Sequence, residues 1–159
     1  MLKKLKSLGG CDGSNMIEAA LVTPLVLILT LGIIDFASMF YTYLALENGV
    51  SQATRFAITG NDMDDPDNPG TPLPREAAIR AALEDATPAI NMDYVSISYS
   101  HMTPGSSSWT GGAGGPGDIG KVSVAYTWTP LTPILRPLLT NGQLTVHVES
   151  AMKNESRWE

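Results

Sequence analysis

The residues with the clearest chemical potential lie near the N-terminus. Gly13 is followed by four residues and then by Glu18, and this short motif separates a basic leader from a long apolar run. A glycine has no side chain to obstruct a protease and resists continuation of a helix, so the Gly13–Ser14 peptide bond is a candidate cleavage site. An unpaired carboxylate in hydrocarbon costs several kcal/mol. Glu18 therefore needs a cationic partner if it enters the apolar region.

The apolar run is the element that must position both residues. No charged residue occurs between Ala19 and Ile34, and the stretch counted from Met16 approaches the ~20 residues that cross ~30 Å of hydrocarbon. Cationic flanks stay in the cytoplasm. Because Lys3, Lys4 and Lys6 precede the run and the next cation is Arg55, we expect a single-pass protein of the inner (cytoplasmic) membrane. Its N-terminus should lie inside and the chain after about residue 40 outside.

Charge and cysteine content exclude several classes of partner. The formal charge of −6 divides into +2 for residues 1–13 and −8 for the remainder. An acidic exported part argues against nucleic acid, since phosphate binding needs a basic surface. Cys11 is the single cysteine, which leaves no intramolecular disulfide and no cysteine-based zinc site. Lipidation of Cys11 is not expected either, because the apolar region follows the cysteine instead of preceding it.

The exported part shows no pattern typical of a catalytic, cofactor or metal site. His101 and His147 have no acidic companion at motif spacing, and we expect His147 at an exposed strand position. Four aspartates occur between Asp62 and Asp67. Their spacing fits no EF-hand, so a solvated linker over residues 61–70 is preferred to a calcium site. We do not expect an enzyme.

The basic leader, Gly13, Glu18 and the apolar run together resemble the prepilin signal that type IV prepilin peptidases read. The resemblance implies cleavage after Gly13 on the cytoplasmic face. Ser14 then becomes the mature N-terminus and Glu18 the fifth mature residue. The new α-amino group of one subunit could meet Glu18 of a neighbour, and a paired charge is tolerable where a lone one is not.

Residues 17–57 resemble the TadE-like family of minor pilins, or pseudopilins, from tight-adherence (Tad/Flp, type IVc-like) pili. The similarity lies in the Glu-Ala-Ala start, Pro24 within a leucine-rich run, Gly-Ile-Ile-Asp-Phe at 32–36 and Ala-Thr-Arg at 53–55. Residues 150–155 are similar to the family's C-terminal pattern. The resemblance covers the first third of the chain and, weakly, this tail.

The resemblance implies a subunit stored in the inner membrane and later present in the extracellular pilus, with a role in pilus initiation, assembly or tip. Implied partners are the prepilin peptidase, the major pilin, other minor pilins and the pilus assembly platform with its ATPase. Two alternatives remain open. One is a pseudopilin of a type II secretion system, and the other is a signal-anchored envelope protein that is never cleaved.

Two residues inside the apolar helix have further expected roles. Pro24 removes a backbone donor, so a kink or local unwinding is expected there. Asp35 lies near the outer edge of the span. It either marks the boundary between lipid and water or pairs with another pilin or a platform protein.

The expected fold class is α+β. Residues 1–13 form a cytoplasmic leader, 14–60 a transmembrane and assembly helix, and 61–159 an exported pilin-like domain. Beyond Asp35 the helix has an intermittent apolar face made of Phe40, Leu44, Ala45, Ala53, Phe56 and Ala57. The exported domain should hold a short helix at 74–86 and alternating strands at 94–100, 121–128 and 143–149. Their antiparallel sheet, three-stranded or larger, can cover the outer half of the long helix.

Two connections in the exported domain have open interpretations. Residues 103–120 hold seven glycines, and we expect either a disordered hairpin connection or an exposed contact loop with Trp109 as its adhesive residue. The proline-rich segment 129–139 is expected to pack over the sheet edge or to touch a partner.

Gly13→Val should leave the protein about 13 residues longer at its N-terminus, because a β-branched side chain crowds the scissile bond. Mass spectrometry of the membrane-extracted chain from pilus-producing cells measures this directly. A wild-type chain that begins at Met1 in those cells would contradict processing after Gly13.

Overall fold

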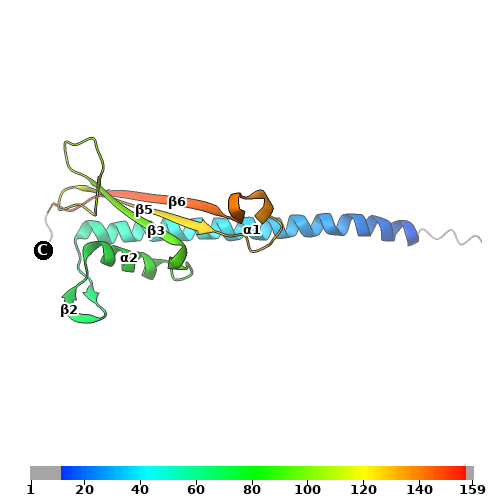
Figure 1. Cartoon of the computed structure of the whole chain (residues 1–159), viewed down its shortest axis with the longest axis horizontal. Coiled ribbons are helices and arrows are strands. Elements are labelled where there is room, and N and C mark those ends of the chain that lie inside the picture. The colour runs from blue at the N-terminus through cyan, green and yellow to red at the C-terminus, as the bar shows by residue number, and fades with distance from the viewer. Residues whose placement is uncertain (1–11, 157–159) are drawn as a thin grey trace, which may run out of the picture.

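The computed structural model describes residues 12–156, so the leader residues 1–11, with Cys11, lie outside the described part of the chain. A single helix dominates the structure (Figure 1). This helix, α1, runs from Asp12 to Thr59 and is 48 residues long. It passes through Gly13 and Pro24 without interruption. The helix is therefore continuous at Pro24, and the kink expected there stays a prediction.

Residues 61–156 form a C-terminal domain that packs against the C-terminal half of α1. A small hairpin of β1 (Asp64–Asp65) and β2 (Asn68–Pro72) precedes helix α2 (Arg75–Ala86). The main antiparallel sheet has the order β4-β3-β5-β6, with β3 at Val95–Met102, β4 at Thr110–Gly111, β5 at Ile119–Trp128 and β6 at Leu144–Lys153. The connections hold three short 3-10 helices: η1 (Met92–Tyr94), η2 (Arg136–Leu138) and η3 (Thr140–Gly142). The α+β class and the predicted helix and strands are confirmed.

The sheet and α2 pack against different sides of α1, as Figure 1 shows. Alternation along the strands decides which face is buried, since successive side chains point to opposite sides of a sheet. Val122 and Val124 on β5 and Val148 on β6 are buried in the core. The neighbouring Ser123 and Glu149 pair across the outer face. The expected covering of the outer half of the helix by the apolar sheet face is therefore confirmed.

The buried face of α1 matches the predicted one only in part: Ala53 and Ala57 belong to it as predicted, and Ala45 and Phe56 pack against it partly buried. Leu46, Val50, Ala53 and Ala57 form it, with at most 8% of each residue exposed. Their spacing of four, three and four residues places them on one side of a helix. Phe40 and Leu44, which were expected on this face, are 49% and 40% exposed. The helix carries apolar residues on more than one side, and packing against α2 and the sheet selects the side with Leu46 and Val50.

The glycine-rich connection is more ordered than expected. It supplies β4, which pairs with β3 at Ser100 and His101, and its second half is tied to the C-terminal segment. The Asn154 side chain donates to the Gly115 carbonyl over 2.8 Å, and the Asn154 backbone amide donates to the Asp118 carbonyl over 2.7 Å. These bonds correct the expectation of a disordered loop for residues 112–118.

The end of α1 is closed by distant groups. Carbonyls in the last turn of a helix have no partner within the helix. The Arg75 guanidinium donates to the Ala57 carbonyl, and the Glu155 amide donates to the Ile58 carbonyl over 3.0 Å. The acidic residues that follow form the β1–β2 hairpin instead of a plain linker. There the Asp65 carboxylate accepts from the Asp67 amide over 2.9 Å.

Helix α2 is held close to both α1 and the sheet. The Tyr99 hydroxyl donates to the Glu76 carbonyl over 2.9 Å. Burial, with a smaller contribution from the nearby Glu76 carboxylate, raises the pKa of Tyr99 to about 12. On α1, Gly49 faces α2, and a Cβ at this position would overlap the Thr87 methyl group and lie 3.2 Å from a Leu83 methyl. The Thr87 hydroxyl donates to the Leu83 carbonyl over 2.7 Å, so its methyl cannot turn away without breaking that bond.

Gly49→Ala should therefore reduce the free energy of unfolding of the C-terminal domain by ~1–3 kcal/mol, because an added methyl overpacks the α1–α2 contact. Thermal unfolding of the full-length protein in detergent measures the effect. Gly32→Ala is the matched control, since it brings the same gain in helix propensity and its Cβ meets nothing within 4 Å. Equal unfolding temperatures for the two variants would contradict the close approach.

Candidate membrane and assembly site

The N-terminal half of α1 has little protein packed against it before Asp35. Its large apolar side chains are 47% to 77% exposed: Met16, Ile17, Leu21, Val22, Leu25, Val26, Leu27, Ile28, Leu29, Ile33 and Ile34. Residues Asn15–Thr59 form a helix that is long and apolar enough to cross a membrane, and none of its most apolar window is buried. Apolar surface of this extent on one helix needs lipid or other helices around it.

The residues predicted for processing and assembly lie at the N-terminal end of this helix. Gly13 and Ser14 belong to the first turn of α1. Glu18 lies one turn further on and is exposed. No described residue contacts Glu18 through a hydrogen bond or an ion pair, so its carboxylate is open to a group from outside the described part of the chain.

Asp35 has a different environment from the one expected. Its side chain is fully buried, with 0% exposed. One carboxylate oxygen accepts from the Thr132 amide over 3.0 Å, and the other accepts from the Thr132 hydroxyl. The Leu131 backbone and the Arg136 guanidinium add favourable interactions. Asp35 is thus paired within its own chain. Of its two expected roles, pairing with another pilin or a platform protein would need an exposed carboxylate, and marking the boundary between lipid and water stays a prediction.

The partner of Asp35 is the segment 129–143, which connects β5 to β6. Residues 129–139 were expected at the sheet edge, but the structure places them against α1 beside Asp35 (Figure 1). Trp128 and Pro130 are buried at the base of the segment. The Arg136 guanidinium donates to the Pro130 carbonyl over 3.3 Å and folds the segment back on itself. We call residues 129–143 the foot.

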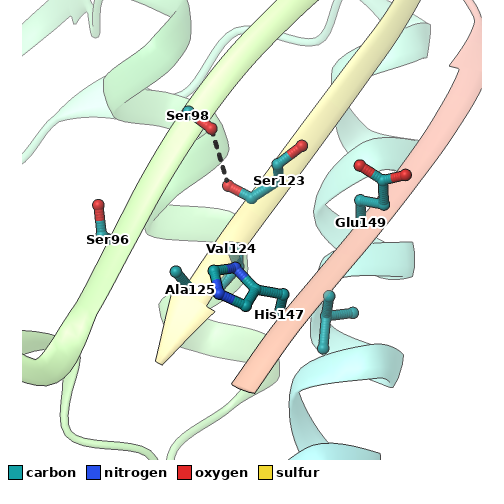
Figure 2. Close-up of a pocket in the computed structure, with 8 residues that line it drawn as sticks. Ser96, Ser98, Ser123, Val124, Ala125, His147 and Glu149 are labelled. Atoms are coloured by element: carbon teal, nitrogen blue, oxygen red, sulfur yellow. Dashed lines mark hydrogen bonds between the residues drawn. The ribbon is translucent and has the colours of Figure 1, made fainter. Parts of the chain in front are cut away.

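The outer face of the sheet carries His147 together with several serines and a glutamate. Figure 2 shows a depression on this face, lined by Ser96, Ser98, Ser123, Ala125, His147 and Glu149 among others. The Ser98 hydroxyl donates to the Ser123 backbone carbonyl over 3.4 Å. His147 is exposed, as predicted, and pairs in register with Ala125. Among the described residues no hydrogen bond joins His147 to a serine.

The remaining polar clusters have structural partners. His101 is half-buried, and its Nδ1 lies 3.2 Å from the Gly112 carbonyl. Trp109, the expected adhesive residue, is 43% exposed, and the Lys121 ammonium lies 4.6 Å from its ring centroid. Lys121 also pairs with Glu149 at 3.4 Å. Residues 12–156 contain no group of three or more His, Cys, Asp or Glu side chains arranged to hold a metal ion.

The part of the chain that resembles a known protein family is the helix that carries this site. Residues 13–55 match the model of the family described as TadE-like protein. The resemblance stated from the sequence is therefore confirmed for this part of the chain, which covers most of α1 and begins at Gly13. No curated protein and no solved structure matches the chain.

Sequence reasoning missed Thr132 and Arg136 as partners of Asp35. One available signal was the position of Asp35 seven residues before Thr42 and fourteen before Gly49, both of which are buried. Residues seven apart lie on nearly the same side of a helix, so Asp35 continues the buried face of α1. A second signal was the complete absence of acidic residues from the foot within a strongly acidic domain.

Thr132→Val should free the foot from α1, because it leaves one oxygen of a buried carboxylate without its hydroxyl donor, at a cost of ~1–3 kcal/mol. Hydrogen–deuterium exchange of residues 129–143 in the detergent-solubilised protein should become faster. Thr129→Val is the matched control, since Thr129 also precedes a proline but is exposed. Equal exchange in the two variants would show that the Asp35–Thr132 bonds do not hold the foot.

Proposed function

We propose that this chain is a minor pilin, or pseudopilin, of a tight-adherence pilus, cleaved after Gly13 by a prepilin peptidase. The observation that carries the proposal is the family match over residues 13–55. It begins at the glycine where cleavage is proposed and ends within the part of α1 that the exported domain covers. The mature protein then starts at Ser14 with an almost entirely apolar helix.

The two halves of α1 support this role. The exported domain covers only the C-terminal half, while the N-terminal half exposes its apolar side chains. We propose that this bare half lies in the inner membrane before assembly, with the domain on the outer side. After extraction it would pack against the helices of the major pilin and of other minor pilins. The assembly platform would act on this membrane-stored form.

Glu18 provides the electrostatic part of the proposal. Cleavage at Gly13 creates a cationic α-amino group on Ser14, and Glu18 is the nearest carboxylate that is exposed on the bare half of α1. A carboxylate of one subunit and an amine of the next can neutralise each other inside a helix bundle, where each alone would be costly. This pairing would set the axial position of each incoming subunit in pilus initiation, assembly or tip formation.

Glu18→Ala should permit membrane insertion and cleavage but reduce incorporation into pili. Insertion should survive because the substitution removes a charge from an apolar segment. Assembly should fall because the neighbour's amine is left uncompensated, at a cost of roughly 3 to 5 kcal/mol, which corresponds to a loss of about a hundredfold or more in the docking equilibrium.

The measurement is the amount of processed protein in membrane and sheared-pilus fractions at matched expression. Glu84→Ala, which removes an exposed carboxylate from α2, is the control for loss of charge alone. Equal recovery of Glu18→Ala and wild type in both fractions would refute the pairing. A wild-type chain with its leader intact would instead favour an uncleaved envelope anchor.

A further inference from the structure

The foot carries an apolar surface that faces solvent. Leu131, Ile134 and Leu138 are 65%, 38% and 78% exposed. A surface loop that needed only to connect β5 to β6 would have little reason to present three large aliphatic side chains to water. The part of the foot that is buried, Pro130, and the bonds from Thr132 to Asp35 fix the backbone beneath them.

The position of the foot along α1 is set by its bond to Asp35. The helix from Met16 to Asp35 has about 20 residues and spans ~30 Å, the thickness of the hydrocarbon core of a bilayer. Asp35 therefore lies at the outer boundary of the span when the bare half of α1 crosses the membrane. Figure 1 shows the foot at the end of the domain that faces this bare half.

The aromatic residues just beyond Asp35 also indicate that this part of α1 lies at the outer boundary of the membrane. Phe36, Phe40, Tyr41 and Tyr43 are all at least 37% exposed, and the rings of Phe36 and Phe40 stack with centroids 6.4 Å apart. Exposed tyrosines gather where a span meets the headgroup region, because their rings are apolar and their hydroxyls are polar.

The charge of the foot also fits a lipid surface. Residues 129–143 contain Arg136 and no Asp or Glu, although the chain after residue 13 has a net charge of −8. Anionic headgroups repel acidic segments and attract basic ones. The foot is thus the part of the exported domain that can approach such a surface without repulsion.

We propose that the foot is a membrane contact, in which Leu131, Ile134 and Leu138 enter the outer leaflet of the bilayer that α1 crosses. The bonds between Thr132 and Asp35 then hold an interfacial anchor at a fixed distance from the start of the span. This anchor sets how far α1 rises from the bilayer and keeps the stored subunit at one depth. The proposal rests on the membrane span that forms part of the proposed function.

Depth-dependent quenching of a fluorescent label tests the contact. The full-length chain carries Cys11→Ser, so that one introduced cysteine bears an environment-sensitive fluorophore, and it is reconstituted in phosphatidylethanolamine and phosphatidylglycerol vesicles that contain a spin-labelled lipid. The test position is Leu138→Cys. Because Leu138 is exposed, this substitution leaves the core intact. Leu27→Cys reports the span. Ser106→Cys reports an exposed loop at the end of the domain away from the bare helix.

The label at Leu138 should show blue-shifted emission and severalfold stronger quenching than the label at Ser106, with strongest quenching by a spin label near the headgroups. Leu27 should be quenched most by a label deep in the bilayer. Water-like emission at Leu138 together with quenching at Leu27 would overturn the membrane contact and leave the span intact. Water-like emission at both positions would overturn the span, and the contact with it.

Discussion

Asp35 is a buried carboxylate on α1, at the end of its apolar segment. It needs hydrogen-bond donors from elsewhere in the protein, and this requirement decides which segment packs against the helix there. The donors come from Thr132, whose amide and hydroxyl bind the two carboxylate oxygens. Because a buried unpaired charge is far more costly than a paired one, the foot must lie where Asp35 is. That contact fixes the point at which the covered half of α1 gives way to the bare half.

The far end of α1 is fixed by a second group of contacts. The Arg75 guanidinium and the Glu155 amide donate to carbonyls in the last turn of the helix. The Asn154 side chain joins the C-terminal segment to the glycine-rich connection. The sheet and α2 are thereby held to the helix at one end by polar caps and at the other by the foot. Between these ends, Leu46 and Val50 pack without exposure to water.

This arrangement suits a subunit that changes its surroundings without changing its shape. The core of the C-terminal domain uses the C-terminal half of α1, so the N-terminal half remains available, under the proposed function, for lipid and later for other pilin helices. Lipid and neighbouring apolar helices both keep these apolar side chains away from water. Under the proposed function, Glu18 is the residue that distinguishes them, because a neighbouring subunit's amine would be present only in the assembled pilus.

The sequence by itself determined the elements whose signals are local: the apolar length of α1, the Gly13–Glu18 spacing, helix α2 and the alternation of β3, β5 and β6. Those patterns depend on residues a few positions apart, and they persist whatever packs nearby. Only the tertiary structure decided the partner of Asp35, which is 97 residues away in the chain, and the choice of Leu46 over Phe40 for the core. When a helix has apolar residues on several sides, its own sequence does not decide which side is buried. Nor does it decide which donor a carboxylate will bind, because the candidate donors come from segments that only the fold brings close.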